Sequence, residues 1–290
     1  MEANPETVTP ELARLLRAGA VNRVSLGAQS FQAHLLDVLE RRASPDDVRR
    51  AVHTLRDAGF DNVSLDLIYG IPGQSASDLD RDLAEALALE PEPEHLSCYE
   101  LEAKPGTRFT HAHGAELERQ AEAMEGYFEQ VVVTLADAGY RWYETANFCL
   151  QAGDAEGRDL RARHNLGYWH GRDYLGIGMG AVSTISGERR RNAPSLGRYV
   201  AALSAGRRPP SEIEIIDDET HEREKLLLGL RLDEPLAIAD VGGALDREAL
   251  ARMVAGGLVQ LSSNGRGEEI SLTRRGRFLG GGVTSEIISA

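Results

Sequence analysis

The chain has 290 residues and a formal net charge of -14, so it can bury one large or two smaller cores, and most of its surface repels nucleic acid and anionic membranes. Its two cysteines, Cys98 and Cys149, are too few for a disulfide-stapled secreted domain. Residues 1–5 show no basic, apolar leader, and no apolar run approaches the roughly 20 residues of a membrane span. We therefore expect a cytoplasmic protein with no transmembrane segment and no nucleic-acid partner.

The first third of the chain alternates predicted strands and helices. Residues 22–27 read as a strand, and an amphipathic segment follows over 31–40. A second helix begins after Ser44, with Pro45 at its first position and Asp47 three residues after the cap. This order of elements is typical of βα units.

The alternation continues to about residue 107. Residues 63–69 are apolar over a strand-like length, which suits a strand covered on both faces in a parallel sheet. We expect a helix from Ser77 to Leu89 and another strand over 95–101. The predicted fold class is α/β, with a partial (βα) barrel over residues 1–108.

The alternation of predicted strands and helices ends after residue 107. We expect one long helix over 116–138, an extended segment over 140–148, an exposed loop over 151–163 and a solvated loop at Arg189–Arg191. Near the end, a helix over 246–254 precedes a hairpin over 258–272 that turns at Asn264-Gly265, whereas Gly280–Gly282 is a poor helix former. The sequence thus predicts an α+β segment over 109–215 and a small, winged-helix-like module over 216–290.

Polar residues accompany the predicted strands of the first third. Gln29 follows the first strand, Asp66 lies within the 63–69 strand, and Glu2 stands where an earlier strand would end. Ligands of parallel βα sheets bind at the carboxyl ends of the strands, so we expect a small-molecule site there. The rigid turn over 70–74 can pack against an adenine ring. Taken singly, each of these residues is better explained as a loop hydrogen bond or a helix cap.

Several blocks along the chain resemble one family in order and nearly end to end. The blocks cover residues 2–5, 23–31, 66–74, 143–148, 163–169, 174–178, 228–232 and 272–276. They resemble the HemW/HemN branch of the radical S-adenosylmethionine (SAM) superfamily. The His164-Asn165-x-x-Tyr168-Trp169 block favours the haem-chaperone side of that branch.

The resemblance implies roles for residues of the first third. Glu2, Gln29, Arg41 and Asp66 match positions that contact SAM in the family. A carboxylate can accept hydrogen bonds from ribose hydroxyls, and a guanidinium offers a fork to the methionyl carboxylate. Arg42 is the alternative to Arg41, and a solvated helix-end arginine is the plainer reading of either.

The same resemblance associates His164, Asn165, Tyr168 and Trp169 with haem. Imidazole is a common axial ligand, and aromatic rings can flank a porphyrin. The competing interpretation is a packed, hydrogen-bonded histidine that locks a domain junction. Cys149 is a competing ligand, although it reads better as a small buried residue.

One expected feature of the family is missing. Radical SAM proteins hold a [4Fe–4S] cluster with three closely spaced cysteines, and this sequence has only two, in different segments. The family's glycine-rich SAM contact is also missing. We expect a fragment or a misplaced start rather than a cluster-less relative, and we expect no radical SAM activity from this chain alone.

Three functions remain open from the sequence. The first is a haem chaperone that binds haem and delivers it to haem-accepting proteins. The second is an oxygen-independent coproporphyrinogen III oxidase of porphyrin biosynthesis. The third is a cluster-less binding module.

Overall fold

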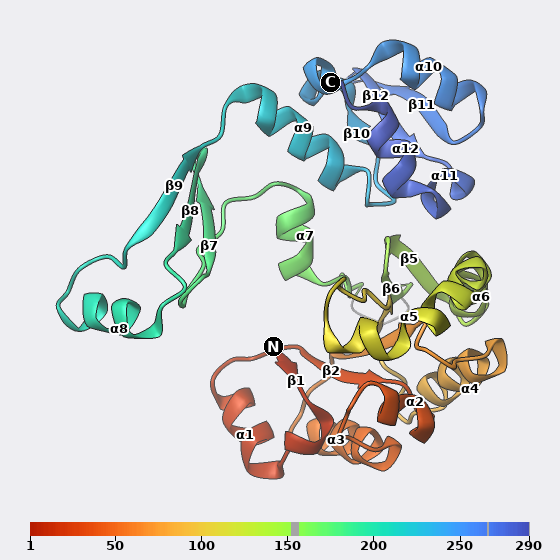
Figure 1. The fold of residues 1–290 in the computed structure, drawn as a ribbon, viewed down its shortest axis with the longest axis vertical. Coiled ribbons are helices and arrows are strands. Elements are labelled where there is room, and N and C mark those ends of the chain that lie inside the picture. The colour runs from red at the N-terminus through yellow and green to blue at the C-terminus, as the bar shows by residue number, and fades with distance from the viewer. Residues whose placement is uncertain (152–156, 266, 290) are drawn as a thin grey trace. The chain divides into compact units, whose positions relative to one another are not determined.

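The computed structural model describes residues 1–151, 157–265 and 267–289. The chain forms two compact units, residues 1–161 and residues 162–290, each with its own secondary structure (Figure 1). Each unit is described by itself below. The predicted three-part division at residues 108 and 215 stays a prediction.

The first unit alternates strands and helices in the expected α/β manner. Its strands are β1 (Glu2–Ala3), β2 (Val24–Gln29), β3 (Val63–Tyr69), β4 (His95–Glu100), β5 (Tyr140–Glu144) and β6 (Asn147–Leu150). Its helices are η1 (Pro5–Thr7), α1 (Pro10–Ala18), α2 (Ala33–Val38), α3 (Pro45–Asp57), α4 (Ala76–Leu87), α5 (Arg108–Gln120), η2 (Ala121–Ala123) and α6 (Met124–Asp137).

The strands form one six-stranded sheet in the order β1-β2-β3-β4-β6-β5. Strands β1 to β4 are parallel, and the β5–β6 hairpin joins them in antiparallel pairing. The parallel part is the partial βα barrel that the sequence predicted.

Local sequence explains where α3 begins. The Ser44 hydroxyl accepts the Asp47 amide at 3.3 Å, while the Asp47 carboxylate accepts the Ser44 amide at 2.7 Å. Pro45 occupies the first turn, where its missing N–H costs nothing. The predicted capping box is therefore confirmed. The buried face of the helix carries Val48 and Leu55.

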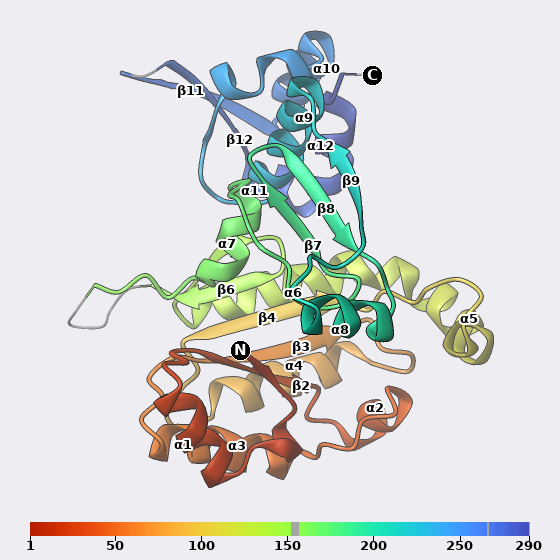
Figure 2. The same ribbon diagram turned by 90° about the vertical axis from the view of Figure 1, so that its left-hand side faces the viewer.

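The two faces of the sheet differ in chemistry. Along parallel strands, paired residues share a face and successive residues alternate. One face is apolar, and α3, α4 and α6 cover it (Figure 2); it carries Val24, Leu26, Val63, Leu65 and Leu96. The other face, which we call the polar face, carries Glu2, Ser25, Ser64, Asp66, His95 and Ser97.

Two helix predictions in this unit were wrong in their bounds. The single helix expected over 116–138 is two helices, α5 and α6, joined by η2. Gln120 at the break is buried, and its amide Nε2 donates to the carbonyls of Ile71 at 3.2 Å and Gln74 at 2.9 Å. Helix α4 begins after Ser75 rather than at Ser77, because the Ser75 hydroxyl accepts the Asp78 amide.

The segment expected to be extended over 140–148 is the β5–β6 hairpin. Of the loop expected over 151–163, residues 152–156 lie outside the described residues.

The second unit contains two small sheets and several short helices. Its strands are β7 (Val182–Ile185), β8 (Glu188–Asn192), β9 (Ser211–Ile215), β10 (Leu236–Ala237), β11 (Val259–Asn264) and β12 (Gly267–Leu272). Its helices are α7 (Arg163–Trp169), α8 (Leu196–Ser204), α9 (Asp218–Gly229), η3 (Ile238–Asp240), η4 (Gly242–Ala244), α10 (Arg247–Ala255), α11 (Arg274–Phe278) and α12 (Gly280–Ile287). The sheets have the orders β7-β8-β9 and β10-β12-β11.

The C-terminal elements follow the predicted helix and hairpin order. Asp246 caps α10, and β11 pairs with β12 from Val259–Leu272 to Asn264–Gly267. A core of apolar residues from α9, α10, the hairpin and α12 joins them. Strand β10 pairs with β12 to complete a three-stranded sheet, and α11 and α12 follow the hairpin; the winged-helix-like module stays a prediction.

One local prediction in the second unit was wrong, and one segment is helical despite its poor helix propensity. Arg189–Arg191 is not a loop but part of β8, where Arg189 forms ion pairs with Glu214 at 3.2 Å and Glu224 at 2.6 Å. Gly280–Gly282 begins α12, because Val283 and Ile287 bury themselves in the core and offset the poor propensity of glycine. Within the described ranges, no helix is both long and apolar enough to cross a membrane.

Candidate functional site

Asp66 stands in the middle of the polar face. The Ser25 hydroxyl donates to Asp66 Oδ1 at 3.0 Å, and the Ser97 hydroxyl also lies in hydrogen-bonding contact with the carboxyl. Burial raises the pKa of Asp66, and the nearby charge of Glu2 raises it further, while the two serines act in the opposite sense. The polar face thus carries two carboxyl groups, Glu2 and Asp66, and the nearby positive charge of Arg23 also acts to lower the pKa of Asp66.

Gln29 reaches the same face through a distortion of β2. The strand pairing shifts between Gly27 and Gln29, and Gln29 has a φ of 64°, a conformation that side-chain-bearing residues rarely adopt. A Cβ on Gly27 would lie 2.7 Å from Gln29 Nε2, so the amide folds back over the strand where Gly27 pairs with Asp66. Glycine at 27 is what leaves room for this amide.

The structure thus brings Glu2, Gln29 and Asp66 onto one face. Glu2 pairs with Ser25, whose hydroxyl bonds Asp66. Asp66 lies within its strand rather than at the rim. Arg41 lies exposed in the loop between α2 and α3, and Arg42 beside it is exposed too, so the choice between them stays a prediction.

A second group of polar residues on the polar face is fully buried around His95. His95 Nδ1 is 2.8 Å from the Ser64 hydroxyl, and His95 Nε2 is 2.8 Å from the Tyr143 hydroxyl. Burial lowers the pKa of His95 well below its usual value, so the imidazole is neutral. Both ring nitrogens are occupied by protein partners, which makes His95 a structural residue.

A polar chain links Asp66 to the β5–β6 hairpin. The Ser97 hydroxyl donates to Asn147 Oδ1 at 2.9 Å, and Asn147 Nδ2 donates to Glu144 Oε2 at 2.5 Å. The sequence reasoning missed Ser25, Ser97 and Asn147 as neighbours of the site. The available signal was the alternation of small polar residues along strands that also carry Asp66.

The residues present do not fit a [4Fe–4S] cluster. Cys149 pairs with His95, whereas Cys98 lies three residues further along β4, so the two thiols point to opposite faces of the sheet. Both are buried, and burial raises the pKa of the Cys98 thiol. Within the described part of the chain, no group of three His, Cys, Asp or Glu residues could hold a metal ion.

Helix α7 carries the residues predicted to meet haem. The His164 and Tyr168 rings meet edge to face at 5.0 Å, and Tyr168 packs against Tyr174 at 4.7 Å. His164 is exposed. Because His164 and Tyr168 are one helical turn apart, the imidazole stands at the open end of an aromatic row.

Asn165 and Trp169 form the adjacent row of α7. The Arg231 guanidinium lies over the Trp169 ring, 4.4 Å from its centroid. Trp169 Nε1 is buried with no hydrogen-bond acceptor among the residues that the structure describes. Trp169 is thus packed against Arg231, while Asn165 is half-buried, and the contact of these two residues with haem stays a prediction.

The large apolar side chains that follow Tyr174 are exposed to solvent rather than buried. Leu175, Ile177 and Met179 are 69%, 83% and 52% exposed, and they alternate with Gly176, Gly178 and Gly180. At Gly176 a Cβ would lie 2.2 Å from the carbonyl oxygen of Val182, so this glycine is pressed against β7. We call Leu175, Ile177 and Met179 the apolar row.

Comparison with known proteins decides the family. The chain is 34% identical over 289 residues to the heme chaperone HemW of Mycobacterium tuberculosis (strain ATCC 25618 / H37Rv), covering 99% of this chain and 70% of that protein. It is 30% identical over 292 residues to the heme chaperone HemW of Bacillus subtilis (strain 168), covering 98% of this chain and 74% of that protein. The chain belongs to the HemW heme chaperone family.

The wider superfamily and the fold agree with this membership. The model of the radical SAM superfamily matches residues 1–86, the part that holds Glu2, Gln29, Arg41 and Asp66. The solved structure of coproporphyrinogen III oxidase (HemN) from Escherichia coli, a radical SAM enzyme, superposes with a TM-score of 0.76 at 19% identity, covering 98% of this chain and 68% of that one. At this identity the likeness shows the fold alone.

Proposed function

We propose that this HemW-family chain binds haem on α7, with the His164 imidazole as axial ligand, and passes it to haem-accepting proteins. The observation that carries the proposal is the exposed imidazole at the open end of the His164–Tyr168–Tyr174 row. An imidazole held by ring packing but open to solvent can approach an iron without first being pulled from the core.

The apolar row supports the same proposal. A porphyrin is a large, planar and mostly apolar macrocycle, and its binding needs exposed apolar surface beside the residue that ligates the iron. The row begins at Leu175, next to Tyr174, which packs on Tyr168. Cys149, the competing ligand, is buried in β6 of the first unit, so we do not assign it a role in haem binding.

A haem titration with a matched pair of histidine variants tests this function. His164→Ala should abolish the shift of the haem Soret band that binding to the protein causes, or weaken haem binding at least about tenfold. His170→Ala is the control, because His170 directly follows the same helix and lies 3.7 Å from Glu234. Equal affinities of the two variants would refute ligation by His164. Ile177→Lys should also weaken binding if the apolar row contacts the porphyrin.

We further propose that the polar face holds SAM. Asp66 would accept hydrogen bonds from the ribose hydroxyls, and Gln29 can both donate and accept. The charge of Glu2 and Asp66 favours the sulfonium cation, and Arg41 would pair with the methionyl carboxylate. When bound at a reduced cluster, SAM supplies a 5′-deoxyadenosyl radical, and this chain has no thiol triad to hold such a cluster.

Calorimetric titration with SAM tests the second site. We expect measurable binding by the wild-type chain and binding that is at least about tenfold weaker, but still measurable, by Gln29→Ala. S-adenosylhomocysteine, which lacks the positive sulfur, should bind more weakly. Equal affinity for the two ligands would argue against a site selected by charge.

A further inference from the structure

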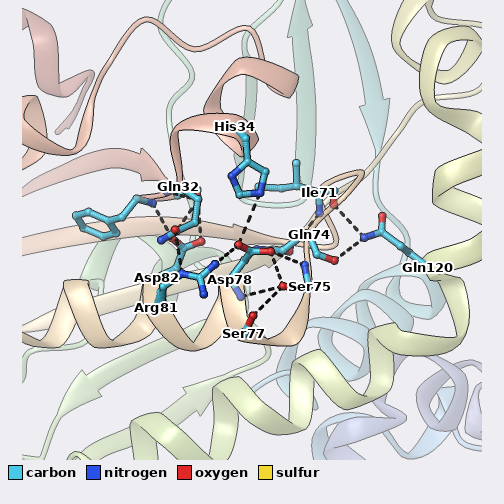
Figure 3. A network of polar contacts seen from close by, with 12 residues as sticks. Gln32, His34, Ile71, Gln74, Ser75, Ser77, Asp78, Arg81, Asp82 and Gln120 are labelled. Carbon is cyan, nitrogen blue, oxygen red and sulfur yellow. Dashed lines mark hydrogen bonds and ion pairs between the residues drawn. The ribbon is translucent and has the colours of Figure 1, made fainter.

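Asp82 of α4 is a buried carboxylate that lies outside the proposed site and accepts several hydrogen bonds. It is 1% exposed. Its oxygens accept from the Ser30 hydroxyl at 2.8 and 3.0 Å, from the Phe31 amide at 2.7 Å and from Gln32 Nε2 at 3.1 Å. Figure 3 shows Asp82 and Gln32 facing each other, with Asp78 one turn away on the same helix. Burying a carboxylate costs folding free energy, so a structural role is needed to explain why Asp82 is held in this position.

The bonded residues are those that directly follow Gln29. Ser30 is fully buried, and its hydroxyl also accepts the Gln32 amide at 3.0 Å, so Asp82 and Ser30 together fix the turn out of β2. Gln29 has its positive φ one residue before this turn. A non-glycine residue in that region stores backbone strain, which persists only when its neighbours hold it.

The neighbouring Asp78 does a different job. Its carboxylate accepts the Ser75 amide at 2.8 Å and forms an ion pair with Arg81, so it caps α4. Helix α4 thus uses Asp78 to fix its own start and Asp82 to fix the exit of another strand. An ordinary helix-capping role does not account for Asp82.

We propose that Asp82 is a positioning residue that holds Gln29 in its left-handed conformation and so aims the Gln29 amide over Gly27 and Asp66. The proposal rests on the proposed SAM site. Asp82 does not touch the ligand. Its carboxylate accepts hydrogen bonds from the turn over residues 30–32. Without these hydrogen bonds, Gln29 would relax to an ordinary strand conformation, and its amide would move away from the polar face.

A double-mutant cycle measured by SAM titration tests the link between the two residues. Asp82→Ala should weaken SAM binding about tenfold, and Asp82→Asn, which keeps an acceptor for Phe31, should restore most of it. In a Gln29→Ala background, Asp82→Ala should have no further effect. Fully additive losses would overturn the proposal. Asp80→Ala is the matched control, because Asp80 is exposed on the same helix and bonds Gln130 of α6.

A measurement without SAM separates this proposal from the site on which it rests. Hydrogen–deuterium exchange of the full chain should show faster exchange over residues 28–32 in Asp82→Ala, and in milder form in Asp82→Asn, with β3 unchanged. Unchanged exchange over residues 28–32 would overturn the positioning role whether or not the chain binds SAM. Absence of SAM binding by the wild-type chain, with the exchange result as expected, would refute only the SAM site.

Discussion

Replacing Asp66 with asparagine should make the protein more stable at neutral pH while it abolishes SAM binding. Burial, and then the charge of Glu2, raises the pKa of Asp66 in the folded state. A carboxyl whose pKa is raised on folding binds its proton more tightly when folded. Its contribution to stability is therefore full below its unfolded pKa, about 3.9, and is lost as the pH rises through the folded value. At neutral pH the ionised carboxylate opposes folding.

The expected gain follows from the neighbours of Asp66. An asparagine keeps an oxygen to accept from Ser25. It also adds an N–H that can donate to the Ser97 hydroxyl, whose own proton goes to Asn147. The exchange removes a desolvated charge, and each unit of pKa shift corresponds to about 1.4 kcal/mol. We expect a gain of about 1 kcal/mol, or roughly 2–4 °C in Tm.

Thermal unfolding followed by circular dichroism over a range of pH measures this gain. The advantage of Asp66→Asn should be present at neutral pH and should shrink as the pH falls through the raised folded-state pKa of Asp66. It should be smallest below about 3.9, where the wild-type carboxyl is protonated in both states. Asp80→Asn, at an exposed position, should leave Tm nearly unchanged. A lower Tm for Asp66→Asn at neutral pH would refute the reasoning, because it would mean that the charge is compensated in the fold.

Three further outcomes follow from the structure. His95→Ala should destabilise the first unit by about 3 kcal/mol in urea unfolding, since it leaves a cavity and removes a buried hydrogen-bond partner of the Ser64 and Tyr143 hydroxyls; a loss below about 1 kcal/mol would contradict this. Gly176→Ala should disturb β7, because its Cβ would meet the Val182 carbonyl, whereas Gly197→Ala has open space and should be tolerated; circular dichroism and haem titration compare the two. After anaerobic reconstitution with iron, sulfide and dithionite, the chain should form no 5′-deoxyadenosine from SAM above a no-protein control, because it lacks a thiol triad.

Local sequence determined much of the fold of the first unit. The Ser44-Pro45-x-Asp47 pattern placed the start of α3, and the apolar run over 63–69 marked β3 as a strand buried in a parallel sheet. The family resemblance, now borne out by relatives over nearly the whole chain, came from short blocks of residues. These features can be read in sequence because caps, strand periodicity and motifs act over a few residues.

Other features depended on contacts between distant segments. Where α5 ends, the Gln120 side chain bonds the carbonyls of residues 71 and 74, and in β8 the Arg189 side chain pairs with acidic residues of β9 and α9. No local pattern contains these partners, so the sequence predicted one long helix and a loop instead.

For the candidate site, the sequence by itself determined which residue types are present, and the tertiary structure decided how they are presented. Glu2, Gln29 and Asp66 could be named from motifs. Only the parallel register placed them on one face, and only the bulge at Gly27 turned the Gln29 amide over Asp66. Asp82 lies 50 residues or more along the chain from the turn residues that it bonds, so no local pattern could reveal its role. Hydrogen bonds over such separations depend on how strands and helices pack, and that is a property of the folded chain as a whole.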